Sequence, residues 1–276
     1  MNEKIRKSAV AGLFYPEDPT ELKKLIESLL EENKRSKNYD NIVGIVAPHA
    51  GYIYSGKSAA IAYNVLKDNS EFETAIIISP SHQEYFKGSC IYDGDAYETP
   101  LGEIHINKAI AKYIVDSCES VFFGENGHKE EHALEVQLPF LQTITEYCDI
   151  VPIVIGDQNF NNLQELASVL SELVDEKTIV IASSDLSHFH PKDKAAELDN
   201  IVIERIEKFE YPELYNDLAN SKCEACGGGG IVALLETADI IGRNSAEVLS
   251  YTDSGNVSDD NSSVVGYLSA VIYEKE

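Results

Sequence analysis

The chain has 276 residues, and its apolar fraction of 43% at this length is enough to bury a substantial core. Its formal net charge of −25 argues against nucleic acid as a partner, because binding to phosphates requires a basic surface. The same charge disfavours binding to anionic membranes. The N-terminal residues lack the apolar stretch of a secretory signal, and no run approaches the roughly 18 apolar residues of a spanning helix. We therefore expect a cytoplasmic protein.

The first predicted element is a helix over residues 19–33, because Asp18, Pro19 and Glu21 combine a capping box with proline at the first helical position. Alternating strands and helices follow. The strands are expected at 42–47, 74–79, 151–155 and 178–183, and the helices at 58–67, 109–117, 132–144 (where Pro139 is a candidate kink), 163–174 and 194–209. Residues 89–106 are expected to form short antiparallel strands, and two further strands are expected at 247–253 and 263–274.

The four internal strands are continuous runs of Val, Ile and Ala, which are typical of strands buried on both faces of a parallel sheet. Interleaved helices and antiparallel additions then predict an α/β fold. No linker or change of composition separates two cores. We expect a single domain over residues 1–276, with a central mixed, largely parallel sheet flanked by helices.

Three of the apolar runs are followed by a histidine: GIVAPH ends at His49, AIIISPSH at His82 and IVIASSDLSH at His188. Open α/β sheets build their sites at the carboxyl ends of the strands. A single histidine in a turn is more often bonded to backbone than to a ligand. Two of them after neighbouring strands, which lie about 4.8 Å apart, can meet at one ion.

Cys226 supplies a third donor just before a glycine run and an apolar helical pattern. A helix N-terminus lowers the pKa of a thiol and so favours the thiolate that binds metals. Two imidazoles and a thiolate suit Fe, Cu or Zn, and do not suit Mg or Ca. Cys223 and Cys226 also form a CxxC pair, so a redox-active dithiol is a rival interpretation.

Asp185 precedes His188 by three residues, a spacing that lets a carboxylate orient an imidazole and raise its basicity. The alternative is that Asp185 caps the following turn and His188 is merely nearby.

The segment His128-Lys-Glu-Glu131-His132 matches the order of inverted zinc proteases, but Asn126-Gly127 precedes it and argues against the continuous helix that such a motif requires. If His132 and Glu135 open a helix, they share one side of it and line the pocket.

Seven segments carry a resemblance to a known family, in this order along the chain: AVAGLFYP, APHAGYIYSG, SPSH, TPLGE, EHALEVQLPFLQ, SSDLSHF and CGGGG. Together they resemble the Memo family, named after a human mediator of cell motility, and the resemblance covers essentially the whole chain. It implies a fold similar to class III extradiol dioxygenases, with non-haem iron at the centre. It also implies a metal site of His49, His82 and Cys226, with Asp185 and His188 beside it. Extradiol dioxygenases use a carboxylate where this chain has a cysteine, so their activity does not carry over.

The leading hypothesis is a mononuclear metalloprotein with Fe(II) or Cu, or alternatively Zn, that carries out redox chemistry on a small substrate. His188 would be the general base and Asp185 its orienting partner. Tyr54 is the expected substrate contact, together with His132 and Glu135.

Two other functions remain open. The signalling role of the human relative suggests a non-catalytic module that binds a peptide or a phosphorylated ligand, with Lys57 as the nearest basic residue. Zinc-dependent hydrolysis, with Asp185 or Glu131 activating water, is the third hypothesis. Microbial members of the family often accompany a radical-SAM protein, which suggests a functional link to one.

Overall fold

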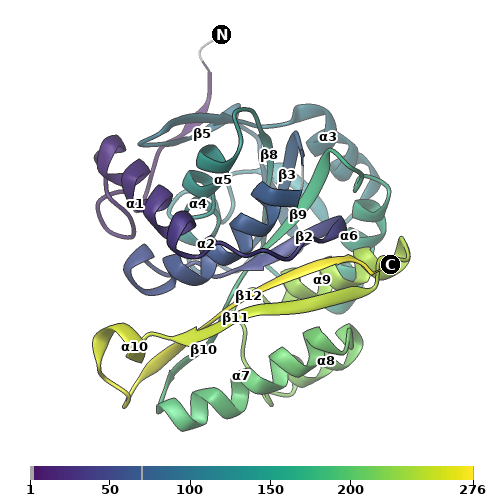
Figure 1. Ribbon diagram of the computed structural model, residues 1–276. Coiled ribbons are helices and arrows are strands. Elements are labelled where there is room, and N and C mark those ends of the chain that lie inside the picture. Colours follow the sequence, from purple (N-terminus) through teal and green to yellow (C-terminus); the bar gives the residue numbers. More distant parts are fainter. Residues whose placement is uncertain (1–2, 70, 276) are drawn as a thin grey trace.

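The structure, a computed structural model, describes residues 3–69 and 71–275. Within this part of the chain, nine strands form one mixed sheet (Figure 1). Its centre is parallel and consists of β2 (Asp40–Ala47), β9 (Thr178–Ser183), β3 (Thr74–Pro80) and β8 (Asp149–Ile155), in that spatial order. These four are the strands that the apolar runs predict.

Antiparallel strands extend the sheet on both sides. On one side β12 (Val264–Glu274) pairs with β2 and also carries β10 (Asp185–His190) and β11 (Ser245–Asp253). On the other side β4 (Ser89–Tyr92) is antiparallel to β8, and β7 (Val121–Gly124) is parallel to β4. A separate small sheet consists of β1 (Ile5–Arg6), β5 (Ala96–Thr99) and β6 (Gly102–His105). The predicted fold class, α/β with a mixed sheet whose centre is parallel, is confirmed.

Helices cover both faces of the large sheet (Figure 1). The first group consists of three helices: α2 (Tyr52–Asn69) packs against α1 (Pro19–Glu32) and α5 (Leu138–Ile144). In the second group, α9 (Gly228–Ile240) packs against α6 (Phe160–Ser171) and α8 (Tyr211–Ala219). The remaining helices are α3 (Lys108–Ser117), α4 (His132–Glu135), α7 (Lys192–Glu207) and α10 (Gly255–Ser258). None of the helices in the described ranges combines the length and apolarity needed to cross a bilayer.

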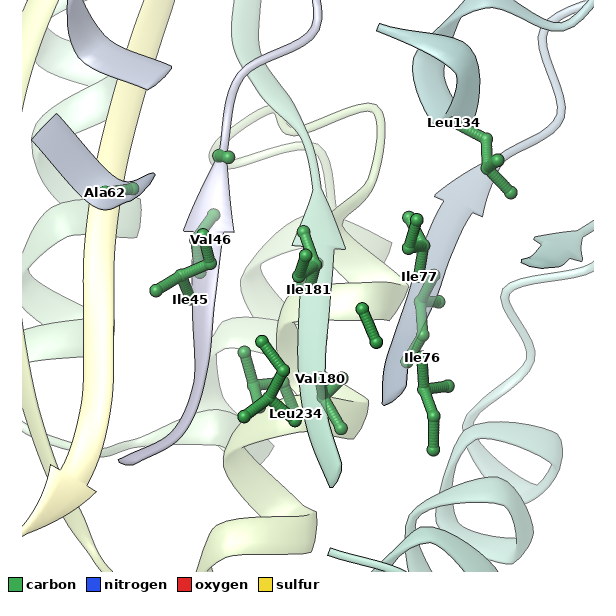
Figure 2. Packing of buried hydrophobic residues seen from close by; sticks show 14 of the residues in the cluster. Ile45, Val46, Ala62, Ile76, Ile77, Leu134, Val180, Ile181 and Leu234 are labelled. Atoms are coloured by element: carbon green, nitrogen blue, oxygen red, sulfur yellow. The ribbon is translucent and has the colours of Figure 1, made fainter. Parts of the chain in front are cut away.

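The core lies between the central strands and the helices that cover them. Figure 2 shows Val46 on β2, Ile181 on β9 and Ile77 on β3 side by side, with Leu234 of α9 packed beneath. All four side chains are completely buried. Burial of such a side chain contributes about 1.5–3 kcal/mol. The sheet is therefore a rigid base that fixes where the loops at its strand ends begin.

The structure differs from the predicted elements in several places, and the sequence patterns did not predict β1, β7 and α10. The helix expected over 132–144 is divided into α4 and α5, and Pro139 lies in the first turn of α5, where its missing N–H costs no hydrogen bond. Pro139 therefore starts a helix and does not kink one. The sequence patterns did not reveal α8. His188 lies within a strand of its own, β10, and not in a loop after the strand at 178–183.

Candidate metal centre

Three predicted ligands come together at the carboxyl edge of the parallel strands. His49 follows β2 by two residues, His82 follows β3 by two residues, and Cys226 lies just before α9. The Nε2 atom of His49 is 3.1 Å from the Sγ atom of Cys226, and the two imidazole centroids are 5.2 Å apart. One donor atom from each residue lies within 4.8 Å of the other two. This spacing is compatible with three donors around one ion.

The tautomer of His49 follows from its hydrogen bonds. Its Nδ1 atom is 3.0 Å from the Oγ atom of Ser183, and that hydroxyl donates its own proton to the carbonyl of Ala133 at 2.6 Å. Ser183 must therefore accept, so Nδ1 of His49 carries the proton. The unprotonated Nε2 faces Cys226. Burial lowers the pKa of His49 well below its usual value, and neighbouring His82 and His132 lower it further, which keeps the ring neutral.

His82 is held in the same tautomer by a carboxylate. Its Nδ1 atom lies 2.9 Å from Oε1 of Glu131, a buried residue, and its backbone N–H donates to Oε2 at 2.7 Å. Because the carboxylate accepts the Nδ1 proton, Nε2 of His82 is left with a free lone pair. A carboxylate–histidine pair of this kind orients metal-binding imidazoles and raises their basicity.

The glycine run places Cys226 at the strand ends. A Cβ atom on Gly227 would lie 2.1 Å from the carbonyl oxygen of Ser183, and one on Gly230 would lie 3.2 Å from Ile78. Only glycine at residue 227 allows the start of α9 to approach the end of β9 so closely. The spacing of Cys226 from the two histidines is therefore fixed by backbone packing.

The expected low pKa of the Cys226 thiol is not observed. Burial raises this pKa, and the negative charge of nearby Asp185 raises it further. Desolvation outweighs the helix N-terminus, since it penalises the thiolate directly. A cation among the three donors would supply the missing opposite charge, because a coordinating thiol is deprotonated outright. The donor set thus fits a bound transition metal.

Asp185 supports His49 and not His188. Its Oδ1 atom accepts the backbone N–H of His49 at 2.8 Å, and burial raises the pKa of its carboxyl group to about 7. The prediction that Asp185 orients the His188 imidazole was wrong, because the carboxyl group turns toward the loop after β2.

His188 is brought toward the site by an irregular strand. The pairing of β10 with β12 shifts register on both sides of His188, and the next residue, Phe189, has a φ of 62°. Bulges of this kind redirect side chains next to sites. Burial lowers the pKa of His188, and the nearby imidazole of His82 lowers it further.

The residues of the HxxEH segment separate. His132 contacts the centre, since its ring stacks on that of His82 with centroids 4.6 Å apart. His128 is buried elsewhere, bonded to the Tyr97 hydroxyl and the Cys90 carbonyl. The resemblance to inverted zinc proteases is therefore accidental.

Glu135 does not line the pocket, contrary to the prediction. Its side chain is fully buried, forms an ion pair with Arg6, and accepts hydrogen bonds from Tyr15 and the backbone of residues 9 and 10. Tyr54, in the first turn of α2, is 40% exposed, and its role as a substrate contact stays a prediction.

The residues that orient the two histidines could not be recognised from the sequence patterns. Ser183 receives a second hydrogen bond from Nε2 of Gln137 at 2.8 Å, and Gln137 in turn accepts from the Tyr63 hydroxyl. The role of Glu131 as partner of His82 was also missed. The available signal was a set of polar residues inside otherwise apolar segments.

A pocket of about 470 Å³ opens beside the centre. Cys226 and His188 form part of its wall, together with Glu224 and the apolar side chains of Leu186, Tyr215 and Leu218. This volume is within the range of small-molecule sites. The pocket therefore gives a small ligand access to the Cys226 side of the three donors.

Comparison with known proteins places the chain among relatives along nearly its whole length. The sequence profile of a family described as Memo-like protein matches residues 6–271. A MEMO1 family protein of Methanocaldococcus jannaschii is 36% identical over 98% of this chain and 99% of the relative. Similar proteins of Desulfurococcus amylolyticus and Methanosarcina barkeri are each 38% identical, over 98% and 97% of this chain and 99% and 100% of the relatives.

Proposed function

The chain belongs to the Memo family, and we propose that it is a mononuclear metalloprotein that carries out redox chemistry on a small substrate. His49 and His82 would hold the ion through Nε2 and Cys226 through Sγ. The observation that carries this proposal is the convergence of one donor from each residue within 4.8 Å of the others. The protonated Nδ1 atoms support it, because they leave both Nε2 lone pairs for the ion.

The donor set favours Fe(II) or Cu as the ion. Thiolate and imidazole ligands suit Fe, Cu and Zn, whereas Mg and Ca prefer oxygen. An iron or copper ion supplies Lewis acidity and one-electron redox chemistry when bound. Zn fits the same donors, so its identification would replace the redox proposal with hydrolysis.

His188 is the residue best placed to take a proton from the substrate. It lines the pocket beside Cys226, and its lowered pKa keeps it neutral and able to accept a proton at pH 7. His132, which contacts the His82 ring, and Tyr54 would contact the substrate. Asp185 would act indirectly, by holding the peptide of His49 in place.

Zinc-dependent hydrolysis has less support from the hydrogen bonds. A base that activates water needs a free lone pair directed at the water. Glu131 accepts from the ring and backbone of His82 and from the backbone of Ala133. Asp185 accepts from the backbone of His49. Three of the roughly four lone-pair directions of Glu131 are therefore taken, and Asp185 holds the peptide of His49 through one of its oxygens.

Elemental analysis of protein purified without oxygen tests the proposal. We expect about one Fe or Cu ion per chain and a thiolate-to-metal charge-transfer band. The variants His49→Ala, His82→Ala and Cys226→Ser should each lose most of the metal. His105→Ala, which changes an exposed histidine of β6, is the matched control and should keep it. Wild-type protein without any transition metal, or the same metal content in all four variants, would contradict the proposal.

A further inference from the structure

The lining of the pocket beside Cys226 is acidic, which does not favour a phosphorylated ligand. Among the described residues that line it, Glu224 is the one carboxylate, and neither lysine nor arginine is present. Lys57, the basic residue nearest to His49 in the sequence, is exposed on α2 and does not line the pocket. An anion entering this pocket would therefore meet the Glu224 carboxylate with no lysine or arginine among the described lining residues to offset it.

The start of α9 does not offer an anion site either. Free N–H groups in the first turn of a helix bind phosphate and carboxylate groups. Here the first four are already bonded within the protein: Gly227 to Ser184 Oγ, Gly228 to the Ala225 carbonyl, Gly229 to Gln158 Oε1 and Gly230 to the Gly227 carbonyl. The glycine run thus allows close packing, and its N–H groups are not free to bind a phosphate.

The Glu224 carboxylate can accept further hydrogen bonds from a ligand. Its Oε1 atom is 3.0 Å from Nε2 of His190, and its Oε2 atom accepts the backbone N–H of His188 at 3.3 Å. A carboxylate has about four lone-pair directions, so about two remain free. Its side chain is 42% exposed, and it lies on the same pocket wall as Cys226. A donor group of a bound molecule can therefore reach Glu224 while the rest of the molecule lies near Cys226.

The other walls favour an apolar body. Leu186, Leu218 and Tyr215 line the pocket, together with the side chains of Cys223 and Cys226. From these features we propose that the pocket binds an uncharged or cationic small molecule with an apolar or aromatic body, whose amine or hydroxyl group donates to Glu224. It discriminates against carboxylates and phosphates. This proposal rests on the proposed function only in taking the pocket as the substrate site of the metal centre.

Three probes with one skeleton test the charge preference: 2-phenylethylamine, 2-phenylethanol and phenylacetate. Their dissociation constants are measured by ligand-observed NMR titration of wild-type protein, both metal-free and metal-loaded. We expect the amine to bind about fivefold or more tightly than phenylacetate, as one partly exposed ion pair allows. The alcohol should lie between them, and O-phosphotyrosine should bind most weakly.

Two variants assign the preference to the pocket. Glu224→Gln should remove most of the advantage of the amine over phenylacetate. Glu213→Gln removes an exposed carboxylate of α8 that does not line the pocket, so it controls for the general negative charge and should change nothing. Equal binding of phenylacetate and the amine, an unchanged preference in Glu224→Gln, or binding of neither amine nor alcohol would each overturn the proposal.

The outcome is independent of the redox proposal. Because the preference depends on Glu224, it should persist in metal-free protein. Absence of metal from wild-type protein together with the predicted order of probes would overturn the redox function and keep the pocket. A metal-loaded protein that prefers phenylacetate would overturn the pocket proposal and keep the metal centre.

Discussion

The carboxylate of Glu131 holds His82 at two points, through the imidazole Nδ1 at 2.9 Å and through the backbone N–H at 2.7 Å. The same carboxylate accepts the backbone N–H of Ala133 and so caps α4. One buried side chain therefore fixes the ring, the peptide and the neighbouring helix. The loop after β3 cannot move independently of α4.

Replacing Glu131 by glutamine should weaken metal binding without removing a ligand. The amide lacks the negative charge that raises the basicity of His82, so we expect affinity to fall about 10–100-fold. Competition with a chromophoric chelator measures this change. Glu130→Gln, which alters the exposed neighbour, is the control and should bind as wild type does. Equal affinities of the two variants would show that Glu131 has no part in the centre.

The buried ion pair between Arg6 and Glu135 should be essential for stability. Arg6 also donates to the carbonyls of His128 and Glu131, so it ties β1 to the segment that carries the carboxylate of the centre. Arg6→Met leaves the buried Glu135 carboxylate without a counter-charge, and we expect a loss of about 3–5 kcal/mol in the free energy of unfolding. Urea denaturation measures it.

The adjacent Lys7 provides the control for Arg6. It pairs with Glu98 at the surface, where solvent screens the two charges and the pair contributes little to stability. Lys7→Met should therefore cost much less than Arg6→Met. Similar costs for both variants would argue that the buried pair is not a stabilising contact.

The ligands of the centre could be predicted from the sequence because their positions follow from topology. A buried parallel strand can be recognised in the sequence as an apolar run, and the residues after the run lie at the carboxyl edge of the sheet. His49 and His82 satisfy this rule directly. Cys226 satisfies it through its glycine run, which signals a close approach of the helix start to other backbone.

The partners of these ligands could not be predicted in the same way. Ser183 lies 134 residues from His49 and Glu131 lies 49 residues from His82, and no periodic pattern relates them. For Glu135 a periodic pattern was present, but the prediction drawn from it was wrong. Helical spacing placed it beside His132, but the small N-terminal sheet brings Arg6 to its carboxylate and removes it from the pocket.

Acid should destabilise the protein through His128. Burial lowers the pKa of this histidine from 6.5 to about 4, whereas the unfolded chain takes up the proton near 6.5. The unfolded state thus binds more protons between these values, so stability is complete above pH 6.5 and declines toward pH 4. Lowering the pH from 7 to 5 should cost about 2 kcal/mol from this residue. Urea denaturation at both pH values should show a smaller loss in His128→Gln, and equal losses would refute the assignment.

Gly227 fixes the position of Cys226 by allowing the start of α9 to pack against β9. In Gly227→Ala the new Cβ would lie 2.1 Å from the Ser183 carbonyl oxygen, so α9 must move away from β9. We expect a loss on the order of 3 kcal/mol in the free energy of unfolding, together with loss of the thiolate-to-metal band. Gly51→Ala is the control, because its Cβ would lie an ordinary 3.5 Å from the Phe14 carbonyl oxygen. If Gly227→Ala binds metal and unfolds as the control does, backbone packing does not set the position of Cys226.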